Sequence, residues 1–174
     1  MYGYFAILKE YAKSETDFEI VAKHSLEVLA KSIEIIGRKE LYGEIDLDLI
    51  VSGAILHDIG AFGFLGNKDK AGYIRHGIVG GEILRGLGLG REARIAERHT
   101  GSGLAKEEII ANGWDLPHED FLPATPEEKL ICYADKFSSK SPGKKDTPET
   151  ILREFENYGK GPLERFLKLK GMFE

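Results

Sequence analysis

Apolar residues recur at three- and four-residue steps along most of the chain. Between residues 18 and 36 they form one face of an amphipathic helix. Thr16, followed by Glu19, predicts a capping box at the start of this helix, and Gly37 predicts its end. A second helix is predicted over residues 46–58, where the buried stripe runs to the beginning of a His-Asp pair.

The same periodicity predicts helices over residues 76–87, 91–99 and 105–111. Thr125 can cap a further helix because Pro126 suits its first position and Glu128 completes a capping box; this helix continues towards residue 138. Two more helices are expected, one from Thr147 and one from Pro162 to about residue 173. No apolar–polar alternation predicts a strand, so the expected fold is an all-α single domain over residues 1–174.

Glycine-rich segments separate some of these helices. Residues 61–75 contain three glycines and two phenylalanines that are expected to be exposed, which predicts a long loop. Residues 138–146 are rich in Ser and Lys, which predicts a connection. The glycines at 86, 88 and 90 follow a helix and lack the spacing of a dinucleotide-binding loop, so they predict a helix-to-helix turn.

Composition narrows the classes of function. The chain has 174 residues, 42% of them hydrophobic and 30% charged, which predicts one domain with a true core. It has no apolar run of about 18 residues that could span a bilayer, and its first ten residues do not resemble a secretory signal, so we expect a cytoplasmic protein without a membrane partner. The single Cys132 excludes a disulfide framework. A net charge of −5 argues against DNA as a partner.

Four polar residues occupy positions that the helical pattern directs towards the core. His57 and Asp58 end the second helix, His24 lies on the apolar stripe of the first, and Asp135 follows the apolar residues of the helix that begins at Thr125. A lone His-Asp pair at a helix end is ordinarily a solvated terminus. Burial of all four would be costly unless they were paired, and one divalent metal ion would bind them together.

These residues carry a resemblance to a known family. His57-Asp58-Ile59-Gly60 spells the HDIG signature of the HD-domain metal-dependent phosphohydrolases, and the order His24, His57-Asp58, Asp135 is similar to their H…HD…D ligand pattern. The resemblance covers a motif core at residues 23–136. It implies one HD domain, a helical bundle, on which the C-terminal helices at 147–173 pack.

The resemblance also implies a second ion. His76-Gly77 and His99-Thr100-Gly101 are similar to the extra histidines of dinuclear HD proteins. One ion would then take His24, His57, Asp58 and Asp135, and another would take His76 and His99, with Asp58 bridging. The expected cofactor is therefore one or two divalent ions of Fe, Mn, Co, Ni or Zn. Considered alone, His76 would be an exposed residue at the start of a helix.

By this resemblance the protein hydrolyses a phosphate ester or phosphoanhydride, of a nucleotide or dinucleotide, by a metal-activated hydroxide. Asp58 would orient the hydroxide and Lys136 would stabilise the leaving oxygen. Ala61 stands where many members have a phosphate-binding lysine, and the GYP element of cyclic-di-nucleotide phosphodiesterases is missing. Arg98 and Lys136 are the expected phosphate contacts, together with Arg75 in the glycine-rich loop; the alternative for each is a solvated surface position.

Two other functions share the same ligands. An HD-fold di-iron oxygenase would use the same six residues, and a non-catalytic regulatory domain would bind a nucleotide without turning it over. Phe62, Phe64 and Leu65 would line either a pocket or a homodimer interface. His118 is expected at the surface, and Trp114 and Phe121 are expected to be packing residues rather than a base-stacking platform.

Overall fold

The structure, a computed structural model, describes residues 2–65, 70–138 and 147–174, and in these ranges it is built from helices without a regular strand. The predicted all-α fold is confirmed. In chain order the elements are α1 (Tyr2–Tyr11), α2 (Glu15–Arg38), the 3-10 helix η1 (Leu41–Gly43), α3 (Leu47–Leu56), η2 (Ile59–Gly63), α4 (Lys70–Tyr73), α5 (His76–Gly86), α6 (Gly90–Arg98), α7 (Lys106–Asn112), α8 (Pro126–Ala134), η3 (Asp135–Phe137), α9 (Pro148–Tyr158) and α10 (Lys160–Phe173).

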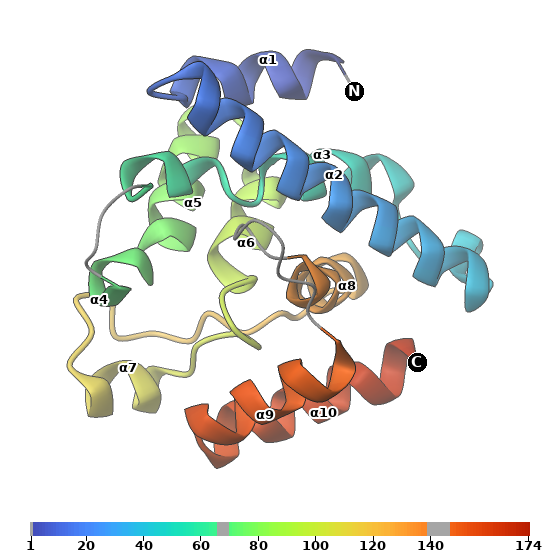
Figure 1. The fold of residues 1–174 in the computed structure, drawn as a ribbon, viewed down its shortest axis with the longest axis vertical. Helices are drawn as coiled ribbons and strands as arrows, with labels where there is room; N and C mark the ends of the chain where they lie inside the picture. Colours follow the sequence, from blue (N-terminus) through green and yellow to red (C-terminus); the bar gives the residue numbers. More distant parts are fainter. Residues whose placement is uncertain (1, 66–69, 139–146) are drawn as a thin grey trace.

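The helices are arranged around three apolar clusters. Figure 1 shows α1 and α2 across one end of the molecule, α5 and α6 in its middle, and α9 with α10 across the other end. One cluster joins α2, α3 and α8 to α9 and α10, and another joins α1 and the first half of α2 to α3, α5 and α6. A small third cluster lies under α7. The middle helices α3, α5, α6 and α8 therefore present their ends to one shared interior.

Helix starts follow local capping, with one correction. Ser14 is the N-cap of α2 and its hydroxyl accepts from the Asp17 amide at 3.1 Å, so the predicted capping box of Thr16 with Glu19 is wrong. Thr16 instead lies in the first turn. The start of α8 is as predicted, because the Thr125 hydroxyl accepts from the Glu128 amide at 3.2 Å. Helix α1 was not predicted.

The predicted loop over residues 61–75 is only partly a loop. The 3-10 helix η2 runs through Gly63, and α4 occupies Lys70–Tyr73, while residues 66–69, including Gly66 and Lys68, lie outside the described residues. Phe62 is buried in the second cluster, so its predicted exposure is wrong. The predicted connection at 138–146 also lies outside the described residues, except for residue 138.

Glycines allow the backbone of α5 to lie in direct contact with the backbones of η2 and α6. A Cβ atom at Gly60 would lie 2.1 Å from the His76 carbonyl oxygen and 2.4 Å from the Gly80 nitrogen. One at Gly77 would lie 2.6 Å from the Ala96 carbonyl oxygen in α6. These contacts fix where α5 begins relative to η2 and α6. The helix-to-helix turn between α5 and α6 is confirmed, with a φ of +77° at Gly88.

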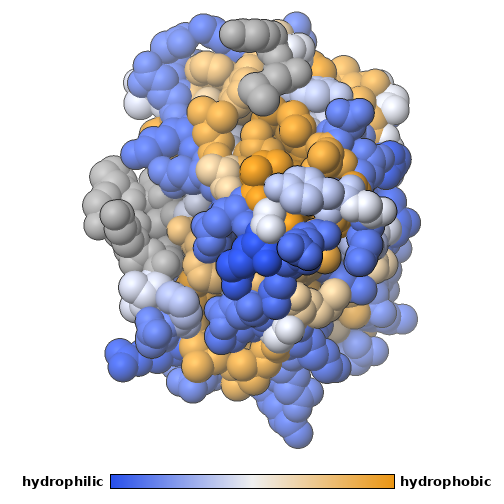
Figure 2. Space-filling model, turned by 90° about the vertical axis from the view of Figure 1, so that its right-hand side faces the viewer, coloured by the Kyte–Doolittle hydropathy of each residue, from blue (hydrophilic) through white to orange (hydrophobic). Residues whose placement is uncertain are grey.

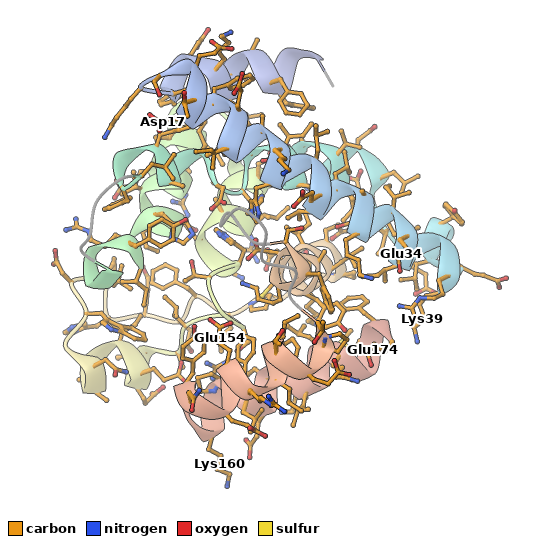
Figure 3. All side chains as sticks on the ribbon, in the orientation of Figure 1. Asp17, Glu34, Lys39, Glu154, Lys160 and Glu174 are labelled. Atoms are coloured by element: carbon orange, nitrogen blue, oxygen red, sulfur yellow. The ribbon has the colours of Figure 1, made fainter. Side chains whose placement is uncertain are left out.

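The C-terminal helices pack through aromatic rings. Phe155 of α9 stacks on Phe166 of α10 at 4.4 Å with an interplanar angle of 6°, and Tyr133 of α8 lies 5.9 Å from Phe166 on centroids. Arg38 at the end of α2 donates to the carbonyl of Phe173 at 2.6 Å and of Glu174 at 3.0 Å. Figure 3 shows Glu174 lying beside this end of α2.

The surface is mixed in character. Figure 2 shows hydrophobic residues gathered mainly in the upper half of one face, with hydrophilic residues over much of the remainder. Among the described residues, no helix combines the length and the apolar character that crossing a membrane requires.

Replacing Gly60 with Ala should destabilise the fold, because the new methyl group meets backbone atoms of α5 that have no rotamer to change. We expect a loss of about 1–3 kcal/mol in the free energy of unfolding, measured by urea denaturation followed by circular dichroism. Gly63→Ala is the matched control in the same 3-10 helix, where a Cβ atom would meet open space. Equal stability of the two variants would contradict the tight contact.

Candidate metal centre

Six polar side chains that the sequence singled out converge in the interior, and five of them stand at helix ends. His57, His99 and Asp135 are the C-cap residues of α3, α6 and α8; Asp58 precedes η2, and His76 begins α5. His24 projects from the middle of α2. The four histidines and Asp58 are buried, and the Asp135 side chain is 11% exposed.

Asp58 lies between two pairs of imidazoles. Its Oδ2 atom is 3.3 Å from Nε2 of His24 and 3.6 Å from Nε2 of His57. Its Oδ1 atom is 3.3 Å from Nε2 of His76 and 3.4 Å from Nε2 of His99. Each carboxylate oxygen therefore serves one pair, and the two resulting groups of ligand atoms are each compact enough to hold one metal ion.

Asp135 completes the first group only. Its Oδ1 atom lies 2.9 Å from Nε2 of His24 and 3.5 Å from Nε2 of His57, and its other oxygen accepts from Lys136 at 2.6 Å. The first group thus contains two imidazoles and two carboxylates. The second contains two imidazoles and the shared carboxylate.

Backbone carbonyls set the tautomer of three histidines. Nδ1 lies 2.8 Å from the Ala54 oxygen in His57, 2.7 Å from the Tyr73 oxygen in His76, and 2.7 Å from the Ala96 oxygen in His99. A carbonyl oxygen only accepts, so Nδ1 carries the proton in each ring and Nε2 presents a lone pair. Metal-binding histidines characteristically donate their second nitrogen in this way.

The facing nitrogens indicate that a cation belongs between them. Nε2 of His76 and Nε2 of His99 are 2.9 Å apart, and the corresponding distance between His24 and His57 is 3.2 Å. In the pair of His76 and His99 both nitrogens present lone pairs, which repel each other at this distance unless a proton or a metal ion lies between them. Burial lowers the pKa of His99, against the opposing effect of Asp58, so this ring favours its neutral form. A divalent ion therefore fits the donor set better than a proton.

The carboxylate of Asp135 stays ionised in this interior. Burial by itself would raise its pKa, but the charge of Lys136 and the hydrogen bond from His24 outweigh burial and lower the pKa well below its usual value. Ionised carboxylate and neutral imidazole are the forms in which these side chains bind transition metals.

A cavity of ≈ 540 Å³ opens beside the centre, with His76, His99, Asp135 and Lys136 in its wall. Lys136 is 14% exposed, and its ammonium also donates to the His99 carbonyl at 3.2 Å. Its position next to the ligands suits contact with a bound anion.

The structure does not bring the two predicted arginines to this cavity. Arg98 donates to the buried carboxylate of Glu128 at 3.1 Å and to the Leu122 carbonyl at 3.3 Å, and Arg75 donates to Asp115 at 2.5 Å. Neither arginine is among the residues of the cavity wall. Both guanidinium groups bind protein acceptors elsewhere, so the phosphate contacts of Arg98 and Arg75 gain no support from this cavity and remain predictions.

Four aromatic side chains line the cavity without having been predicted there: Tyr73, Trp114, Phe155 and Tyr158. Trp114, which was expected to be a packing residue, also lines the cavity, as does Tyr158 at the end of α9. The sequence gives only a weak local sign that Trp114 lies at a turn, which is the glycine before it. In the structure this residue, Gly113, ends α7 in the left-handed region. Phe121 is buried as predicted and His118 is exposed as predicted.

Comparisons with known proteins agree with this geometry. A family model described as HD domain matches residues 21–140. An uncharacterised protein of Methanocaldococcus jannaschii is 39% identical over 140 residues, covering 79% of this chain and 76% of that protein. No solved structure gives a significant match.

Two longer relatives bear an enzyme name. A tRNA (cytidine(56)-2'-O)-methyltransferase of Picrophilus torridus is 42% identical over 95 residues, covering 54% of this chain and 25% of that protein. The methyltransferase of the same name from Thermoplasma volcanium is 34% identical over 120 residues, covering 68% of this chain and 31% of that protein. The matched segment is thus less than a third of either methyltransferase.

Replacing Asp58 with Ala should abolish tight metal uptake, because both groups of ligands share this carboxylate. Elemental analysis after dialysis against Mn²⁺ or Fe²⁺ should find bound metal in the wild-type protein and none in Asp58→Ala. Asp48→Ala, which removes an exposed carboxylate at the start of α3, should keep the wild-type content. Equal metal content in all three proteins would contradict the assignment of the centre.

Proposed function

The chain belongs to the HD domain family, and we propose that it is a metal-dependent phosphohydrolase that cleaves a phosphate ester or anhydride of a nucleotide. The observation that carries this proposal is the placement of Asp58, with one carboxylate oxygen towards each pair of imidazoles. A shared carboxylate can hold two adjacent metal ions together, and two-metal sites occur in phosphatases.

The residues fit two sites. His24, His57, Asp58 and Asp135 would hold one ion, and His76 and His99, with Asp58, would hold the other. Bound ions of this kind lower the pKa of water and neutralise the charge of phosphoryl oxygens. The donor set of imidazole and carboxylate suits Fe, Mn, Co, Ni or Zn.

Lys136 supplies the chain's own positive charge at the reaction centre. Its ammonium is held by Asp135 at 2.6 Å and lies in the cavity wall. From there it can donate a hydrogen bond to a phosphoryl oxygen or to the leaving oxygen. Such a bond is worth more in a largely buried site than in water, because the donor is already oriented.

A small phosphorylated molecule suits this cavity better than a polynucleotide. The volume of ≈ 540 Å³ is typical of sites for a single small ligand. The net charge of −5 opposes the phosphate backbone of an RNA or DNA chain. The methyltransferase name of two relatives therefore does not lead us to propose tRNA itself as the substrate.

Phosphate release in the absence of oxygen tests the proposal. We expect the Mn²⁺-loaded protein to release inorganic phosphate from a panel of mono- and dinucleotides under anaerobic conditions. Turnover that depends on oxygen would instead indicate the di-iron oxygenase chemistry that the same ligands support, and tight nucleotide binding without turnover would indicate a regulatory domain.

Lys136→Met should lower kcat on the best substrate by about 10²–10³-fold, because it removes the charged donor without shortening the side chain. Lys106→Met, which neutralises an exposed lysine of α7 outside the cavity wall, serves as the control and should keep the wild-type kcat. Metal content is measured for each variant, so that loss of the ions is distinguished from loss of the donor. Wild-type kcat in Lys136→Met would remove Lys136 from the mechanism.

A further inference from the structure

Aromatic side chains line the cavity together with residues of the metal centre. Trp114, which follows α7, and Tyr158, which ends α9, both line the cavity. Helix α9 lies outside the residues 21–140 that match the family model. Figure 1 shows α7 at the lower left and α9 across the lower end of the molecule, so the two aromatic residues come from separate elements.

Tyr158 is exposed yet held in one orientation. Its side chain lies edge-on to Phe155 at 5.6 Å with an interplanar angle of 84°, and its hydroxyl donates to Glu154. Phe155 is in turn stacked on Phe166 in the core. Tyr158 nevertheless remains 55% exposed. A large aromatic ring that is both exposed and supported from behind is a preformed surface for another ring.

Trp114 is positioned by the turn that ends α7. Gly113 adopts a φ of +62°, which lets the Trp114 amide donate back to the Ile109 carbonyl at 3.1 Å. The next residue, Asp115, accepts from Arg75 at 2.5 Å. Arg75 directly precedes His76, the first residue of α5 and a candidate metal ligand. This ion pair therefore connects the turn at Trp114 to the start of α5.

Few of the residues in the cavity wall are charged. Lys136 is the sole cation among the described residues of the wall, and it lies beside Asp135 at the metal centre. The other carboxylate of the wall, Glu108, accepts from Arg165 at 2.6 Å and from the Ala105 amide at 3.0 Å. A phosphate is therefore favoured beside Lys136, and the aromatic side chains of the wall favour an uncharged planar group.

We propose that Trp114 and Tyr158 form a stacking surface for the base of a nucleoside monophosphate whose phosphate lies at Lys136. This inference rests on the proposed function and names the substrate class within it. Additional phosphates, as in a dinucleoside polyphosphate, would have no further cation of the wall to meet. Stacking tolerates different bases because every base has a π-face. We therefore expect the surface to distinguish a nucleotide from a sugar phosphate without a base, and to discriminate little between bases.

Fluorescence of Trp114 gives a direct test, because Trp114 is the only tryptophan of the chain. Adenosine 5′-monophosphate and ribose 5-phosphate are the probes, since they share the phosphate and the sugar and differ in the base. We expect the nucleotide to quench Trp114 and to bind at least about ten-fold more tightly than ribose 5-phosphate. Equal affinity of the two probes would overturn the inference.

Variants of Tyr158 locate the second ring. Tyr158→Ala should bring the affinity for the nucleotide close to that for ribose 5-phosphate, whereas Tyr158→Phe, which keeps the ring, should retain most of the preference. Tyr42→Ala is the matched control, because Tyr42 is 60% exposed and lies outside the cavity wall. A wild-type preference in Tyr158→Ala would exclude Tyr158 from the surface.

The ratio of kcat/KM for the two probes separates this inference from the proposed function. Release of phosphate from both probes at equal kcat/KM would support the phosphohydrolase and overturn the stacking surface. Quenching by the nucleotide with no phosphate released from either probe would overturn the proposed reaction on monophosphates and support the stacking surface as a binding site. A preference for the nucleotide in both binding and turnover would support both.

Discussion

The burial of one carboxylate among four imidazoles is the constraint on which the rest of this structure depends. Asp58 is withdrawn from water and surrounded by rings whose Nε2 atoms point towards it. Without positive charge this arrangement would be unfavourable, because a buried carboxylate loses its hydration and the facing nitrogens repel one another. The interior is therefore organised as a receptor for cations, and the surrounding helices serve to hold it in place.

The ends of the helices position the side chains that surround Asp58. At its last turn a helix leaves carbonyl oxygens without intrahelical partners. The Ala54 and Ala96 carbonyls belong to the last turns of α3 and α6, and each accepts a hydrogen bond from the histidine that caps its helix. One backbone feature thus satisfies an orphan acceptor and orients a ligand. The glycine contacts of Gly60 and Gly77 then bring η2, α5 and α6 close enough for these ends to meet.

The sequence was informative wherever a local rule decided the outcome. Helical periodicity directed His24 and Asp135 inward, and the capping pattern placed the start of α8 at Thr125. Contacts between distant segments were beyond its reach. The partner of Arg98 is Glu128, thirty residues away, and the partner of Arg75 is Asp115. Neither pairing has a local signature, so both arginines looked available for a phosphate. Tyr158 was missed for the same reason, since α9 reaches the cavity only through tertiary packing.

Helix α9 lies beyond the segment that matches the HD domain model, so this part of the cavity wall is separate from the domain that the family shares. The six converging polar side chains lie within residues 21–140, whereas Tyr158 lies outside them and is supported by the ring stack of Phe155 on Phe166. Changes in α9 and α10 can therefore alter this part of the cavity wall without touching any of the six converging side chains. HD-domain proteins with different C-terminal helices would then differ in the molecules that they accept while keeping the same polar centre.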